Sequence, residues 1–353
     1  MKSNMKLTLA CVFLCLVSLP MFVSGIKAQS ATAIYINSDG SVTGTSMIQR
    51  DGDIYRLTGN TYDAPITVLR NNIVLDGEGF SLQGSGGWGI AGVAGVEVKA
   101  AINLTCNDVI VRNFNISGWE TGILGAYNGN TIINNNITGT QNALAIYADN
   151  YNVTGNYLAS NIYGVLIKGN TICISNNQIQ NNVDGILIFA SSRNVITENY
   201  IANNDVALNM YTMPPTDVQI YDNNFINKPD ATIVSTTSDQ FSFGNGGTMP
   251  PLDNGTVGNY WSDYTTKYPN ATEIENTNIG NTPYLIRVNP TVIDRFPLMA
   301  PVNIQKTTLA SPSQTPTPSP NPSNFTVQSI LITALIIAFA TCIAVLVFRK
   351  KLL

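Results

Sequence analysis

The middle of the chain, from about Asn107 to Asn227, repeats a short phrase in which an Asn precedes a large apolar residue by two positions. The copies fall at Asn135/Ile137, Asn156/Leu158, Asn177/Ile179, Asn199/Ile201 and Asn223/Phe225, in steps of 21, 21, 22 and 24 residues. A second apolar series keeps the 21-residue step through Ile123, Leu144, Val165, Ile186 and Ala207. This period predicts a solenoid, in which each copy is one turn that buries its apolar face against the neighbouring turns.

The residues within each copy favour strands over helices. Leucine-rich repeats have a similar length but contain a helical segment, whereas these copies are rich in Asn, Ile, Val, Tyr and Gly, which are poor helix formers. Short alternating segments such as 170–175 and 195–199 are typical of strands. We therefore predict an all-β fold, a parallel β-helix whose short strands are separated by bends made of Asn and Gly.

The repeated Asn has a physical role in such a fold. Parallel turns stack about 4.8 Å apart, so equivalent Asn side chains can pass amide hydrogen bonds from turn to turn. Asn also tolerates the left-handed backbone conformation that a sharp bend requires. We predict an inward-facing ladder of Asn side chains, with a ligand-binding column as the alternative.

The segments on either side of the repeats differ from them in composition. Residues 1–28 combine two Lys residues, an apolar run and small residues, which predicts a signal peptide and therefore export. The open strand edges at the ends of a solenoid need covering. We assign residues 31–70 to an N-terminal cap, 71–245 to the β-helix and 246–301 to a C-terminal cap.

The C-terminal part predicts a stalk and a membrane anchor. Residues 302–326 are rich in Pro, Ser and Thr, a composition typical of an extended segment without a core. Residues 327–348 contain a long uncharged apolar run, and 349–353 begin with Arg-Lys-Lys. Such a run spans a bilayer as a transmembrane helix, and the basic tail keeps the C-terminus in the cytoplasm. The β-helix is then held outside the cell on the plasma membrane.

The charge of the chain excludes one class of partner. The sequence has 18 Lys and Arg against 22 Asp and Glu, with no His. A mildly acidic chain without basic clusters does not suit nucleic acid. Outside the two apolar terminal runs only Cys106 and Cys173 remain, on turns too far apart for a disulfide.

Three phrases in the tail complete a pattern that extends beyond the repeats. They are Gly258-Asn259-Tyr260-Trp261-Ser262-Asp263-Tyr264, Ile279-Gly280-Asn281-Thr282-Pro283-Tyr284-Leu285-Ile286 and Asp294-Arg295-Phe296-Pro297-Leu298-Met299. Together with Leu75-Asp76-Gly77-Glu78-Gly79 and the Asn-x-Ile turns, they resemble the NosD-like β-helix proteins, also called CASH domains. The resemblance covers about residues 31–301.

The resemblance implies a right-handed parallel β-helix that is exported, often displayed on the cell surface, and connected with carbohydrates. It also implies a link to copper delivery for nitrous oxide reductase. Copper favours imidazole, thiolate and thioether ligands, and without His we expect no copper site. Relatives carry an Asp-rich loop where this chain has residues 273–278; with few carboxylates there, calcium is an open alternative, and we predict no metal or other cofactor.

The carboxylates of the repeats give the candidates for catalysis. Alignment of the turns on the Asn column places Glu120, Asp184 and Asp205 near one bend, the last two on adjacent turns. Two stacked carboxylates serve as acid and nucleophile in glycoside hydrolysis, or hold a cation. Solvated bend residues are the alternative. Asp76 and Glu78 are likewise either metal ligands or turn residues.

The aromatic residues give the candidates for ligand binding. Tyr157 and Tyr200 occupy the position after the column Asn, two turns and thus about 9.6 Å apart, which matches a disaccharide unit. Trp261 is a further candidate for stacking on sugar, although the tail aromatics are equally suited to closing the last turn as a cap. Seven Asn-x-Ser/Thr sites are candidates for glycosylation: Asn103, Asn115, Asn136, Asn152, Asn254, Asn270 and Asn324.

These observations favour non-catalytic binding of an extracellular or envelope polysaccharide by a surface-anchored NosD-like β-helix. One alternative is a polysaccharide hydrolase or lyase that uses the carboxylate pair. Others are a structural spacer in the cell envelope and a NosD-like factor for maturation of a metal centre.

Overall fold

A computed structural model of the 353-residue chain describes residues 33–86, 99–189, 191–211, 217–226, 232–236, 251–287 and 291–304. All of them belong to the first of two compact units, Met1–Ser311. The predicted signal peptide, transmembrane helix, basic tail and nearly all of the stalk lie outside the described residues. Within the described ranges no helix is both long and apolar enough to cross a membrane.

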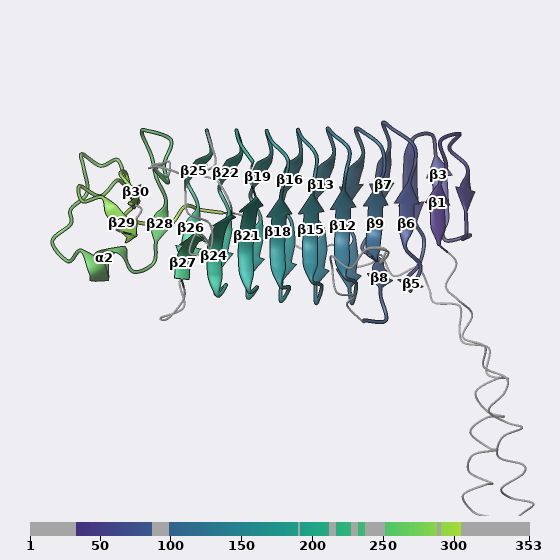
Figure 1. The fold of residues 1–353 in the computed structure, drawn as a ribbon, viewed down its shortest axis with the longest axis horizontal. Helices are drawn as coiled ribbons and strands as arrows, with labels where there is room; N and C mark the ends of the chain where they lie inside the picture. The colour runs from purple at the N-terminus through teal and green to yellow at the C-terminus, as the bar shows by residue number, and fades with distance from the viewer. Residues whose placement is uncertain are drawn as a thin grey trace, which may run out of the picture. The chain divides into compact units, whose positions relative to one another are not determined.

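Three sheets of short strands make up the fold, a parallel β-helix of the right-handed type (Figure 1). We name the sheets A, B and C. Sheet A consists, in spatial order, of β2 (Val42–Thr43), β1 (Ile34–Ile36), β6 (Ile66–Val68), β9 (Ala100–Leu104), β12 (Thr121–Gly125), β15 (Asn142–Ile146), β18 (Tyr163–Ile167), β21 (Asp184–Phe189), β24 (Val206–Tyr211) and β27 (Thr232–Thr236). Each turn of the chain contributes one strand to each sheet.

The other two sheets follow the same order along the stack. Sheet B consists of β25 (Gln219–Tyr221), β22 (Val195–Thr197), β19 (Cys173–Ser175), β16 (Asn152–Thr154), β13 (Thr131–Ile133), β10 (Ile110–Arg112), β7 (Val74–Asp76), β4 (Ile54–Leu57) and β3 (Ile48–Asp51). Sheet C consists of β28 (Tyr260–Trp261), β26 (Asn224–Ile226), β23 (Tyr200–Ala202), β20 (Gln178–Gln180), β17 (Tyr157–Ala159), β14 (Asn136–Thr138), β11 (Asn115–Ser117), β8 (Ser81–Gln83) and β5 (Thr61–Tyr62).

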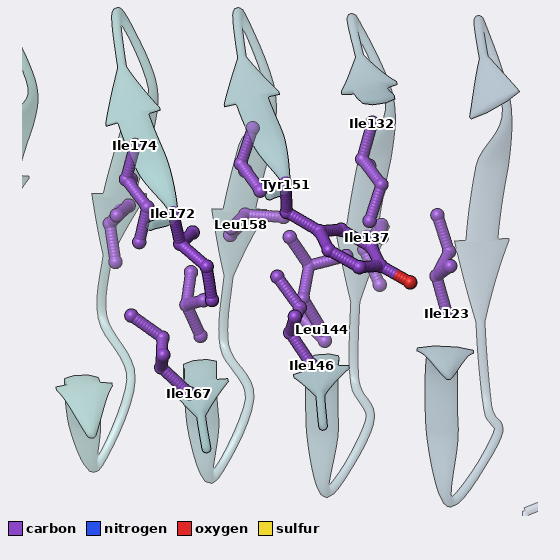
Figure 2. Close-up of a cluster of buried hydrophobic side chains, with 14 of the residues drawn as sticks. Ile123, Ile132, Ile137, Leu144, Ile146, Tyr151, Leu158, Ile167, Ile172 and Ile174 are labelled. Carbon is purple, nitrogen blue, oxygen red and sulfur yellow. The ribbon is translucent and has the colours of Figure 1, made fainter. Parts of the chain in front are cut away.

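Equivalent residues of successive turns pair in register, as the period predicts. Ile137 pairs with Leu158, Leu158 with Ile179 and Ile179 with Ile201, and all are buried. Figure 2 shows the inward side chains of neighbouring turns meeting in one apolar core. The core includes Tyr151, whose hydroxyl donates to Tyr127 O at 2.7 Å.

The apolar series on sheet A departs from the sequence pattern at its last member. Ile186 pairs with Leu208, so Ala207 was the wrong residue for that position. Ile167 still pairs with Ile188 at a step of 21 residues, whereas Ser192 N bonds Asn170 Oδ1 at a step of 22. One residue is therefore added between β21 and β22, and it shifts every later equivalent position.

The first strands are partly antiparallel. β2 pairs antiparallel with β1, and β3 pairs antiparallel with β4. The parallel stack already includes β1, β4 and β6, which lie within residues 31–70. At the other end β28 extends sheet C, and a two-stranded antiparallel sheet of β29 (Tyr284–Arg287) and β30 (Val292–Asp294) follows a short helix, α2 (Tyr264–Lys267).

Candidate functional site

The Asn column is a buried structural ladder. Its members are completely buried: Asn135, Asn156, Asn177, Asn199, Asn223 and Asn259. Each Nδ2 donates to Oδ1 of the next Asn, at 3.1, 3.0, 3.0, 2.9 and 2.9 Å in chain order. No ligand can reach these amides, so a functional site has to lie on an outer face.

The outer face of sheet A presents in-register rows of side chains. Ile123 and Gly125 are buried on the inner side of β12, so Leu124 between them points outward. Register pairing then defines the middle outer row, which runs through Tyr35, Thr67, Asn103, Leu124, Ala145, Leu166, Leu187 and Asn209. A row with one residue per turn repeats about every 4.8 Å. This is a regular surface for a ligand that is itself a repeating chain.

Polar residues accompany the middle row on one side. Thr121, Asn142, Tyr163 and Asp184 begin four successive strands and pair in register. Asn142 Nδ2 donates to Thr121 Oγ1 at 3.2 Å. Asp184 Oδ2 accepts from Asn209 Nδ2 of the middle row at 2.8 Å, which places this carboxylate on the outer side of the sheet.

A cation between aromatic rings follows the strands on the other side. Lys168 Nζ lies 5.0 Å from the centroid of the Tyr147 ring and 4.8 Å from that of Phe189. Tyr147 and Lys168 follow β15 and β18 directly and are exposed. Aromatic rings beside an ammonium group offer a ligand both an apolar stacking surface and a hydrogen-bond donor.

Asp184 is the most perturbed carboxylate of this face. Burial raises its pKa, the hydrogen bond from Asn209 opposes the shift, and the charge of Asp205 adds to it. Asp184 pairs with Val206, so Asp205 is one residue out of register with it while still close enough to interact electrostatically. Glu120 adjoins Thr121, three turns from Asp184 and thus about 14 Å away. The structure brings Asp184 and Asp205 together and leaves Glu120 elsewhere.

Glu120 lines a cavity of about 480 Å³ at the N-terminal end of the same face. Tyr35, Thr67 and Asn103 of the middle row form part of its lining. The other lining residues come from the ends of the strands and from the bends: Ala33, Asp63, Pro65, Gly84, Ser85, Gly86, Lys99, Ala100, Gly118, Trp119 and Glu120. A volume of this size, with aromatic and polar walls, is in the range of ligand pockets.

Tyr157 and Tyr200 lie on sheet C, on a different face. Both pair with Gln178, so they are two turns apart as the sequence predicts. Both rings are half-buried, and Tyr157 Oη accepts from Gln180 Nε2 at 2.8 Å. Their role in ligand binding stays a prediction.

Trp261 is completely buried in the C-terminal cap. Its ring is stacked between Phe225 and Tyr284, with centroid distances of 4.5 and 4.6 Å, and its Nε1 donates to Asp294 Oδ2 at 2.8 Å. Both ring faces are occupied. The geometry fits the closure of the last turn, and no face of Trp261 is left to stack on a sugar.

The glycosylation candidates differ in accessibility. Asn152 and Asn270 are exposed, Asn103 and Asn254 are half-buried, and Asn324 lies outside the described residues. Asn115 and Asn136 are adjacent in register; Asn136 Nδ2 donates to Asn115 Oδ1 at 3.0 Å and Asn115 Nδ2 to Gly79 O at 2.6 Å. Because glycosylation needs a free amide nitrogen, Asn152 and Asn270 are the more suitable candidates.

The acidic residues considered as metal ligands have other partners. Asp76 Oδ2 accepts from Arg112 Nε at 2.7 Å, and Glu78 pairs with Arg56 at 3.2 Å. In the predicted calcium segment, Glu273 Oε1 accepts from Asn278 N at 2.7 Å. Among the residues that the structure describes, no three His, Cys, Asp or Glu side chains are grouped as metal ligands require.

Comparison with known proteins gives a family and a distant structural likeness. The model of the NosD family, described as periplasmic copper-binding protein, matches residues 28–266. Among curated proteins nothing matches. Among solved structures, the chain is similar to the A-module of mannuronan C-5 epimerase AlgE6 from Azotobacter vinelandii, with 17% identity and a TM-score of 0.38. That match covers 59% of this chain and 56% of the module.

Proposed function

The chain belongs to the NosD family, and from that premise we propose that it is an exported protein that binds an extracellular or envelope polysaccharide along the outer face of sheet A without cleaving it. The anchor on the plasma membrane is part of this proposal. It is supported by the apolar run at 327–348 and the basic residues that follow it.

One observation supports the polysaccharide as ligand above all others. The middle row of sheet A repeats once per turn and includes, at its N-terminal end, residues that line a cavity of about 480 Å³. A linear polymer presents the same groups at regular intervals, so it can contact successive turns in the same way. Leu124 and Leu166 offer apolar contacts, while Asn103, Tyr163 and Asp184 offer hydrogen-bonding groups.

Binding by sheet A is testable with two matched Tyr variants of the full chain. Tyr147→Ala removes an exposed ring beside sheet A, and Tyr200→Ala removes a ring of sheet C. In affinity electrophoresis against a panel of polysaccharides, we expect Tyr147→Ala to weaken binding about tenfold, or ~1.4 kcal/mol, and Tyr200→Ala to leave it unchanged. The reverse result would assign binding to Tyr157 and Tyr200. Absence of binding to every polysaccharide would favour a structural spacer.

Copper does not fit the donor set of this chain. The sequence has no His, and burial raises the pKa of the Cys106 thiol to about 11, so this side chain is not a thiolate at neutral pH. Cys106 follows β9 of sheet A, whereas Cys173 lies in β19 of sheet B, separated by three turns. We therefore attribute no copper chemistry, and no role in maturing a metal centre, to the described residues.

A polysaccharide hydrolase or lyase is the second candidate function, and Asp184 is the observation in its favour. Its raised pKa, with Asp205 beside it, is a property of general acids in glycoside hydrolysis. The enzyme hypothesis expects release of reducing or unsaturated sugar ends, abolished in Asp184→Asn. The binding hypothesis expects no release by the wild-type chain, and it expects Asp184→Asn to change affinity alone.

A further inference from the structure

The carboxylate of Glu120 has unusually few hydrogen-bond donors for its burial. Glu120 is 3% exposed, and its one hydrogen bond among the described residues is a long one, from Lys99 N at 3.5 Å. Asp294, which is 0% exposed, accepts hydrogen bonds from Asn259 N, Trp261 Nε1 and Phe296 N.

Two other buried carboxylates show the same contrast with Glu120. Asp253 pairs with Arg295 through both oxygens and also accepts from Gly255 N. Asp76 accepts from Glu78 N, Arg112 Nε and Asn113 Nδ2. These groups are satisfied within the chain, whereas Glu120 is not.

A buried carboxylate without donors is costly, because it has lost its water without gaining hydrogen bonds in return. Glu120 lines the cavity, so donors can come from a molecule bound there. Tyr35 and Asn103 line the same cavity, and they add an aromatic surface and an amide. Hydroxyl donors on a ring with an apolar face are the chemistry of a sugar.

Charge narrows the class of sugar. Glu120 is buried and Asp63 is partly buried in the cavity lining, whereas Lys99 is exposed to solvent, where its charge is screened. The field inside the cavity is therefore negative. A carboxylated or sulfated sugar would be repelled by it.

We propose that this cavity binds one sugar unit without an anionic group, whose hydroxyls donate to the Glu120 carboxylate while its ring packs on Tyr35. This inference rests on the proposed function, because the unit belongs to the polysaccharide that follows sheet A. It adds a selective subsite to a surface that otherwise recognises a repeating chain.

Calorimetric titration of the full chain with oligosaccharides of equal length tests this subsite. We expect neutral hexose oligomers to bind at least tenfold more tightly than hexuronate oligomers. Glu120→Gln keeps the shape but loses the charged acceptor, so neutral oligomers should bind about tenfold more weakly and the preference against hexuronates should shrink.

Two exposed Tyr residues of the N-terminal region provide a matched pair. Tyr35 is 41% exposed and lines the cavity, whereas Tyr62 is 59% exposed and lies in β5 of sheet C. Tyr35→Ala should weaken binding of neutral oligomers several-fold, and Tyr62→Ala should not change it. Both side chains are exposed, so these variants decide the question if Glu120→Gln fails to fold by circular dichroism.

The outcomes separate this inference from the proposed function. Equal binding of hexuronates and hexoses, or full affinity in both folded Glu120→Gln and Tyr35→Ala, would overturn the subsite. The proposed function would survive that result if Tyr147→Ala still weakened binding of the long polymer. If no polysaccharide or oligosaccharide binds, both proposals fail.

Discussion

At the scale of single residues, the Asn ladder shows how one side chain satisfies several backbone groups at once. Asn177 Nδ2 donates to Val153 O, Ser175 O and Asn199 Oδ1, at 2.9, 3.0 and 3.0 Å. Its Oδ1 accepts from Asn156 N and Nδ2 at 2.9 and 3.0 Å. The bends between sheets B and C leave these buried groups without strand partners, and the amide supplies them.

Asn177→Ala should therefore destabilise the protein strongly, because it leaves Asn156 N and the carbonyls of Val153 and Ser175 buried without partners. We expect a loss of roughly 2–4 kcal/mol in the free energy of unfolding, measured by urea denaturation. Asn152→Ala is the control, since Asn152 is exposed on sheet B. Similar losses in the two variants would contradict a structural role specific to the ladder.

At the scale of elements, one turn is the unit of the fold. The residue before each ladder Asn has a left-handed backbone, with φ of 56° at Asn134, 66° at Gly155 and 56° at Asn176. Asn and Gly adopt this conformation at little cost, which explains their recurrence at the bend. A turn with the same bends and the same length can replace its neighbour without disturbing the pairing above and below.

Deletion of residues 156–176 removes one 21-residue turn and joins Gly155 to Asn177, which keeps the ladder in phase. We expect this variant to fold, with a β-rich circular dichroism spectrum and a modestly lower melting temperature. Deletion of 156–175 places Asn176 in the ladder position instead and turns the following inward residues outward, so it should not fold. Equal behaviour of the two deletions would argue against a register fixed by the repeat.

At the scale of the whole folded unit, the three tail phrases meet to close the stack. Asn259 of the first phrase is the last rung of the ladder, and its backbone N–H donates to Asp294 of the third phrase at 2.7 Å. Tyr284 of the second phrase covers Trp261, and its hydroxyl donates to Asp263 Oδ1 at 2.9 Å. Asp294 thus takes the place that the next Asn would have in a further turn.

The pH dependence of cap stability follows from this position of Asp294. Burial raises its pKa from 3.8 to about 7, against the three N–H donors that favour the charged form. Between these values the folded state holds a proton that the unfolded state releases, so this contribution to stability is present below about pH 4 and is lost as pH rises to 7. We expect the free energy of unfolding to fall by roughly 2–4 kcal/mol across this window.

Unfolding followed by Trp261 fluorescence from pH 4 to pH 8 checks this expectation. Asp294→Asn cannot titrate, so its stability should change less across the window than that of the wild type. Asp205→Asn, on the outer side of the repeats, is the control and should keep the wild-type slope. A wild-type stability that rises with pH would mean that the N–H donors outweigh burial.

The sequence by itself determined the period, the parallel β-helix and the inward Asn ladder. Each is written once per turn, and in-register stacking places equal residues above one another, so a repeated pattern is also a spatial one. The burial of Trp261 follows one of the two roles that its sequence allowed. Tyr157 and Tyr200 are two turns apart for the same reason.

The tertiary structure decided whatever the repeat does not encode. One added residue after β21 moved Leu208 into the place expected for Ala207 and put Asp205 out of register with Asp184. Tyr35, Thr67 and Asn103 form one row although their spacings are 32 and 36 residues, because the first turns differ in length. Only folding brings these residues beside Glu120, since irregular bends set their distances and no periodic pattern records them.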